Sequence, residues 1–70
     1  MADNERDKLK TLLDYWIAHN EEHSQEFREW AEKARASGDA EIAEEILQAA
    51  QAMDKAGNLL SQLLERLKEA

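Results

Sequence analysis

Apolar residues recur every three or four positions along two stretches of the chain that are separated by Ser37-Gly38-Asp39. This spacing places apolar side chains on one side of an α-helix. In the first stretch the predicted face is Leu9, Leu13, Trp16, Asn20, His23, Phe27, Ala31 and Ala34, flanked by Leu12 and Trp30 on one side and by Ile17 and Ser24 on the other. In the second stretch it is Ile42, Ile46, Ala49, Met53, Ala56, Leu60, Leu63, Leu64 and Leu67.

The link between the stretches has the residues of a helix–turn–helix connection. Gly38 suits the left-handed position that follows a helix end, and Asp39 suits the cap of the next helix. Because so short a link forces the helices to be antiparallel neighbours, we predict one all-α domain, an antiparallel two-helix hairpin. Its predicted bounds are 1–70 for the domain, about 4–36 for the first helix, 37–39 for the turn and about 40–69 for the second helix.

A hairpin of 70 residues has one helix–helix seam and a small core. The chain has no cysteine, so disulfides cannot stabilise it. Small scaffolds without such links need very regular packing, a metal or oligomerisation. Tyr15, Ile17, Leu47 and Leu59 also widen the apolar surface beyond one seam. We therefore predict a homodimer that forms a four-helix bundle. A marginal monomer, or a domain that packs on a larger partner, is the alternative.

The net charge of -7 bears on possible partners. An acidic chain does not fit nucleic-acid binding, which needs a Lys/Arg surface, nor binding to anionic membranes. No stretch is apolar over the length that a bilayer requires, and the polar start is unlike a signal peptide. We expect a cytoplasmic protein with neither nucleic acid nor membrane as a partner.

Polar residues interrupt the apolar pattern in the middle of the first helix. His19 and His23 have i, i+4 spacing, so their imidazoles can bind one transition-metal ion. Glu26 could add an oxygen ligand, and Glu22 could add one or orient a ring. We expect both imidazoles to point inward, into a gap that Gly57 leaves on the second helix. Nickel, zinc, cobalt and copper all suit imidazole, and a dimer could complete the coordination.

A metal-free interpretation stays open. Histidine and asparagine in a helical bundle can simply form hydrogen bonds and fix the register. The protein would then be a structural or adaptor module whose acidic surface binds a protein partner. No serine has a base and an acid at recognisable spacing, and no glycine-rich phosphate loop is present. We therefore expect a binding protein and not an enzyme.

The segment from Trp16 to Ala31 reads W-I-x-H-N-x-x-H-x-x-x-F-x-x-W-A. It resembles a small helical domain of anaerobic bacteria and archaea that occurs alone or beside nickel-binding proteins of the CooT type, which are linked to carbon monoxide dehydrogenase maturation. The resemblance implies that His19 and His23 are metal ligands, and it implies no reaction. This chain lacks the cysteine-containing nickel-binding segment of CooT proteins.

Overall fold

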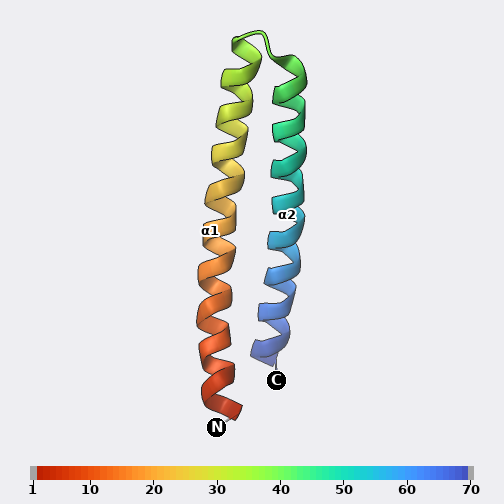
Figure 1. Ribbon diagram of the computed structural model, residues 1–70. Coiled ribbons are helices and arrows are strands. Elements are labelled where there is room, and N and C mark those ends of the chain that lie inside the picture. The colour runs from red at the N-terminus through yellow and green to blue at the C-terminus, as the bar shows by residue number, and fades with distance from the viewer. Residues whose placement is uncertain (1, 70) are drawn as a thin grey trace.

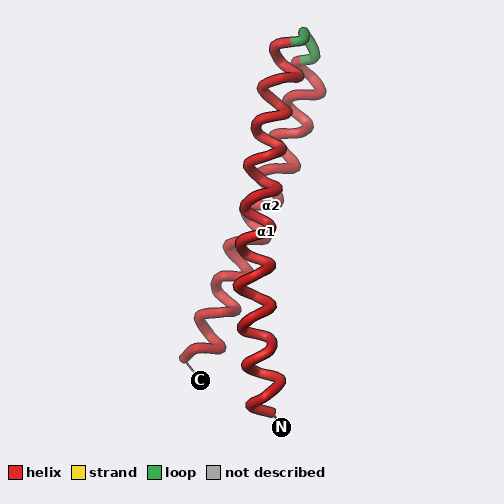
Figure 2. The backbone as a smooth tube through the Cα atoms, turned by 90° about the vertical axis from the view of Figure 1, so that its left-hand side faces the viewer, coloured by secondary structure: helices red, strands yellow, loops and turns green. Residues whose placement is uncertain are grey.

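The computed structural model describes residues 2–69 as two long helices joined by a tight turn, α1 (Ala2–Ala36) and α2 (Ala40–Glu69). The helices lie side by side and antiparallel, so both termini are at the end opposite the turn (Figure 1). Viewed from the side, they cross at a shallow angle (Figure 2). The predicted all-α class and the packing of two long helices are confirmed.

The turn is a Schellman motif, in which two backbone N–H groups satisfy carbonyls at the end of α1. The N–H of Asp39 donates to the carbonyl of Ala34 at 2.9 Å, and the N–H of Gly38 donates to that of Arg35 at 3.0 Å. Gly38 has a φ of 93°, where a Cβ atom would be strained. Asp39 then starts α2, because its carbonyl accepts a hydrogen bond from the N–H of Ala43.

The two helices meet along a seam with the alternating three- and four-residue spacing of a coiled coil. Leu13, Ser24 and Ala31 are buried on α1, and Ala43, Ala50 and Leu64 are buried on α2. Near the turn the buried residues are alanines, and towards the open end they are leucines. Partly buried positions complete the repeat: Arg6, Lys10, Ile17, Asn20, Phe27 and Ala34 on α1, and Ile46, Leu47, Met53, Gly57, Leu60 and Leu67 on α2. His23 is also partly buried but lies outside this repeat.

The seam is rotated relative to the predicted apolar faces. On α1 it includes Ser24, which we expected only at the edge, and it leaves Trp16 exposed. On α2 it includes Ala43 and leaves Ile42 and Leu63 exposed. The predicted faces were wrong in this respect, because each helix carries more apolar surface than one neighbouring helix covers.

Apart from Tyr15 and Leu59, the exposed large apolar side chains gather on one side of the hairpin, which we call the outer face. Its α1 row is Leu9, Leu12, Trp16 and Trp30, and its α2 row is Ile42 and Leu63, all of them exposed. The two rows lie on the same side, because a groove at the open end is lined by Leu9 and Trp16 of α1 together with Leu60 and Leu63 of α2. Neither α1 nor α2, over the residues that the structure describes, has an apolar stretch long enough to span a bilayer.

Candidate functional site

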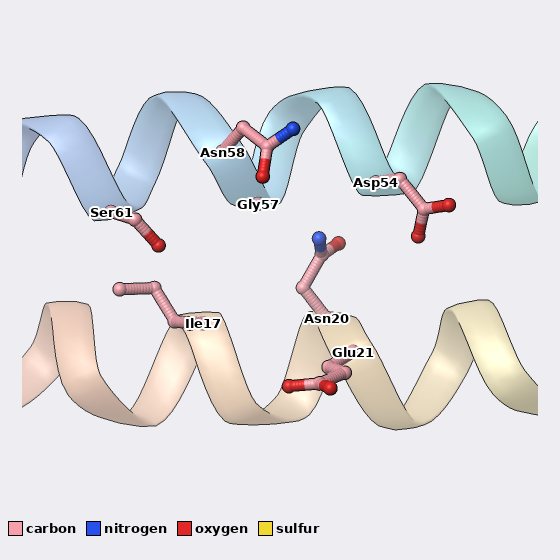
Figure 3. A pocket seen from close by; sticks show the side chains of 7 residues that line it. All are labelled: Ile17, Asn20, Glu21, Asp54, Gly57, Asn58 and Ser61. Atoms are coloured by element: carbon pink, nitrogen blue, oxygen red, sulfur yellow. The ribbon is translucent and has the colours of Figure 1, made fainter.

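Asn20 lies in the middle of the seam and takes the place opposite Gly57. Its amide points across to α2 (Figure 3) and its Nδ2 donates to the carbonyl oxygen of Met53 at 2.5 Å. A Cβ atom on Gly57 would lie 3.0 Å from that Nδ2. The glycine therefore provides room for the asparagine side chain.

A second polar group follows one turn further along the seam. Ser24 is only 3% exposed, and its hydroxyl donates to Oδ1 of Asp54 at 2.6 Å. Arg28 forms an ion pair with the other oxygen of the same carboxylate. The Ser24 hydrogen bond, followed by the Arg28 hydrogen bond, holds the pKa of the Asp54 carboxyl below its ordinary value of 3.8. Every buried polar side-chain atom within the described part of the chain has a partner.

The histidines lie elsewhere. The side chains of His19 and His23 are 50% and 42% exposed, and the hollow that they line is formed by α1 residues alone. Gly57 lines a different groove with Asn20 and Asp54 (Figure 3). The expectation that both imidazoles point into a gap beside Gly57 was therefore wrong. The gap exists, and Asn20 fills it.

The two imidazoles nevertheless converge on each other. A hydrogen bond joins Nε2 of His19 to Nε2 of His23, with the two nitrogens 3.0 Å apart. The ring planes are nearly perpendicular, at 88°, and the ring centroids are 4.5 Å apart. The two Nε2 atoms therefore face each other beside α1, outside the seam.

The predicted acidic ligands lie on the opposite side of each ring. Oε1 of Glu26 is 3.3 Å from Nδ1 of His23, and Oε2 of Glu22 is 3.9 Å from Nδ1 of His19. A carboxylate beside Nδ1 favours a proton on that nitrogen. In the hydrogen bond between the rings, one Nε2 carries the proton and the other accepts it. Glu22 and Glu26 thus lie beside the Nδ1 atoms and not between the two Nε2 atoms.

Aromatic rings continue the row on both sides of the histidines. Tyr15 stacks on His19 with ring centroids 5.3 Å apart, and Phe27 lies against His23 at 6.3 Å. Sequence reasoning had not placed Tyr15 at the site. The i, i+4 spacing of Tyr15, His19, His23 and Phe27 is the signal that could have found it, because residues at this spacing are neighbours on a helix.

Within residues 2–69 no three His, Asp or Glu side chains converge tightly enough to hold a metal ion. A single chain therefore offers two imidazole nitrogens. The remaining coordination positions would be filled by water, by a small molecule or by a second protein chain.

Comparison with known proteins gives a family and nothing beyond it. A family model described as "Domain of unknown function (DUF8180)" matches residues 9–67. No curated protein and no solved structure matches the chain. Because the matched segment covers most of the sequence, the chain belongs to the DUF8180 family of domains of unknown function.

Proposed function

We propose that the protein is a non-enzymatic module that binds a divalent transition metal through His19 and His23 and acts in metal handling or sensing. The observation that carries the proposal is the 3.0 Å distance between the two Nε2 atoms. Carboxylates lie 3.9 Å from Nδ1 of His19 and 3.3 Å from Nδ1 of His23, on the side where metal-bound histidines commonly have an outer carboxylate partner. Glu22 and Glu26 therefore act as orienting groups in this proposal.

The donor type bears on which metals fit. Neutral imidazole nitrogens suit nickel, copper, cobalt and zinc. Nickel is the metal that we propose first. The resemblance to a domain that accompanies CooT-type nickel proteins favours the same metal.

Self-association is the second element of the proposal. The outer face exposes several large apolar side chains, among them Trp16, Leu12 and Leu63. Contiguous apolar surface of this kind marks an interaction site. A second hairpin with the same surface would cover it and form a four-helix bundle, which is the simplest arrangement for an amphipathic hairpin.

Isothermal titration calorimetry with Ni²⁺ at about pH 7.5 tests the metal site. The His19→Ala/His23→Ala variant should bind more than about 100-fold more weakly than the wild type, since outer ligands alone account for 10–100-fold. A matched control is Gln48→Ala/Gln51→Ala, which removes two exposed polar side chains from α2. Binding should also weaken on acidification to about pH 5.5, because protons compete for the imidazole nitrogens. Unchanged affinity in the histidine variant would refute the site.

A second candidate function is that of a metal-free adaptor, and the charge distribution favours it. Residues 20–54 contain ten of the sixteen acidic residues and only three of the nine basic ones. Trp30, within this segment, is 60% exposed. Such a surface suits a basic protein partner with an apolar anchor. In this case His19→Leu/His23→Leu would leave partner binding unchanged, which a pull-down with nickel chelated would measure.

A further inference from the structure

We infer that two copies of the hairpin pack antiparallel through their outer faces, and that His19 and His23 of both copies bind one metal ion at the two-fold axis. The inference rests on the proposed function and specifies its partner, a second copy of this chain. It makes the metal site a property of the dimer, with four imidazole ligands.

One chain supplies only part of the coordination shell of a metal ion. One chain offers two imidazole nitrogens, and among its described residues no further His, Asp or Glu joins them in a metal-binding group. Two imidazole nitrogens are half of a four-coordinate nitrogen site. A second copy related by a two-fold axis supplies the same pair and so completes four nitrogen ligands without any further residue type.

The histidines lie on the side of α1 that faces away from the seam. Alternating three- and four-residue spacing places a second helix-packing row on the side of α1 that α2 leaves open: Leu12, Trp16, His19, His23, Glu26 and Trp30. The histidines are thus part of the outer face. A partner helix that covers the leucine and the tryptophans must also cover the two imidazoles.

His19 and His23 lie at the middle of α1, which runs from Ala2 to Ala36. A two-fold axis that passes between the two α1 helices, at the level midway between His19 and His23, brings His19 of one copy beside His23 of the other. Pairs that lay near either end of the hairpin would instead be far apart in an antiparallel dimer.

The part of α2 that lies beside the histidines has exposed side chains small enough for a second hairpin to pack there. Hydrogen bonds from Asn20 to Met53 and from Ser24 to Asp54 show which part of α2 lies beside the histidines. In that part the exposed row of α2 carries Ala49 and Ala56, between Ile42 and Leu63. The exposed row is therefore bulky towards both ends and shallow in the middle.

The charge distribution selects the antiparallel orientation. The half of the hairpin nearer the turn, residues 20–54, carries a net side-chain charge of -7, which equals the charge of the whole chain, so the open half is neutral. A parallel dimer would place two strongly acidic halves side by side. An antiparallel dimer sets each acidic half against a neutral one, where Arg6 and Arg66 line the apolar groove.

Sedimentation and metal analysis on the full chain test the inference, with Ni²⁺ as the metal and with metal-free protein as the reference. We expect one Ni²⁺ for every two chains and a dimer dissociation constant at least about tenfold lower with Ni²⁺ than without it. In His19→Ala/His23→Ala, Ni²⁺ should leave the dissociation constant unchanged. One Ni²⁺ per monomer would overturn the inference while leaving the proposed function intact. No Ni²⁺ binding at all would overturn both.

Pulsed electron paramagnetic resonance with Cu²⁺ as a probe counts the imidazoles. Four equivalent imidazole nitrogens on one Cu²⁺ are expected, and two would mean that a single chain holds the ion. The result is informative even if a variant fails to fold, because it uses the wild-type protein.

A spin label at the turn determines the orientation. The chain has no cysteine, so Ser37→Cys places a single label at the tip of each hairpin. The hairpin is 54 Å long, and an antiparallel dimer should give a distance near that length. A distance of roughly 20 Å, the width of two packed helices, would show a parallel dimer and overturn the inference.

Discussion

Two polar pairs occupy neighbouring positions on α1 and have opposite surroundings. Asn20 and Ser24 point into the seam, and their hydrogen bonds go to α2. His19 and His23 are each one residue earlier, and their polar contacts stay within α1. A step of one residue turns the helix by about 100°, which is enough to exchange the seam for the outer face.

The comparison distinguishes polar residues that hold the two helices in register from polar residues that are open to a ligand. Nδ2 of Asn20 and the hydroxyl of Ser24 have partners on the neighbouring helix, so these two residues fix the register of the hairpin. The histidine pair has no such partner on α2 and presents two Nε2 atoms beside α1. The histidine site is held by one helix and is open on its outer side. Asn20 lines a groove of its own, but its Nδ2 is already bonded to Met53.

The largest expected effect on dimerisation comes from charging the outer face beside the histidines. Trp16→Glu should raise the dimer dissociation constant by at least about 30-fold, since a buried interface tryptophan typically contributes 2 kcal/mol or more. Analytical ultracentrifugation measures this. Gln62→Glu introduces the same charge at an exposed position of α2 outside the outer rows and is the matched control. Equal weakening by both variants would contradict the assignment of the interface.

Removing the carboxylate of Glu26 tests its role beside His23. Glu26→Gln should weaken Ni²⁺ binding by about 10–100-fold, because Glu26 contacts Nδ1 of His23 and sets its tautomer. Glu21→Gln is the control, since Glu21 is an exposed carboxylate that turns away from α2 (Figure 3). Calorimetric titration measures both affinities. If Glu21→Gln weakens Ni²⁺ binding as much as Glu26→Gln does, the effect comes from the loss of negative charge and not from the contact with His23.

A double-mutant cycle tests the seam side. Gly57→Ala alone should lack the gain of about 1 kcal/mol that alanine normally gives inside a helix, because the new methyl group would press on Nδ2 of Asn20. In an Asn20→Ala background the same substitution should recover most of that gain. Urea unfolding monitored by circular dichroism gives the four free energies. Additive effects would show that Gly57 and Asn20 are not coupled.

The smallest expected effect is a pH dependence that belongs to the seam network. The pKa of Asp54 in the folded protein lies below 3.8, owing to the hydrogen bonds from Ser24 and Arg28. The folded state therefore binds its proton less readily than the unfolded state, and the stabilisation is present above pH 3.8 and is lost as the pH falls through the lowered pKa.

Asp54→Asn should accordingly be less stable than the wild type at neutral pH, with a difference that shrinks on acidification below about pH 3.8. Urea unfolding at several pH values measures the difference. A gap between the two proteins that stays constant down to pH 2 would show that the carboxylate charge has no part in the network.

The turn and the pairing of the helices could be predicted from the sequence because their signals are local. Gly38 and Asp39 act within a few residues, and the antiparallel arrangement follows from so short a link. The rotation of α1 about its axis could not be predicted. The chain contains two overlapping apolar rows, one through Leu13 and Ile17 and the other through Leu12 and Trp16, and either could have formed the seam.

The contact between the two histidines could be predicted because its signal is local, but the side of α1 on which it lies could not. The i, i+4 spacing brings His19 and His23 together whatever the helix packs against. Which pair faces α2 depends on the fit between Asn20 and Gly57, and that fit is set by the register of two distant segments. The side of each ring that Glu22 and Glu26 contact depends on rotamers, which the spacing does not determine.

The most direct test of the distinction between the two pairs is imidazole and amide NMR of ¹⁵N-labelled protein during titration with diamagnetic Zn²⁺. The Nε2 resonances of His19 and His23 should move to metal-bound positions while both Nδ1 atoms remain protonated, and the side-chain amide of Asn20 should stay unchanged. Unperturbed histidine resonances at saturating Zn²⁺, or a response confined to Asn20 and its neighbours, would contradict the account.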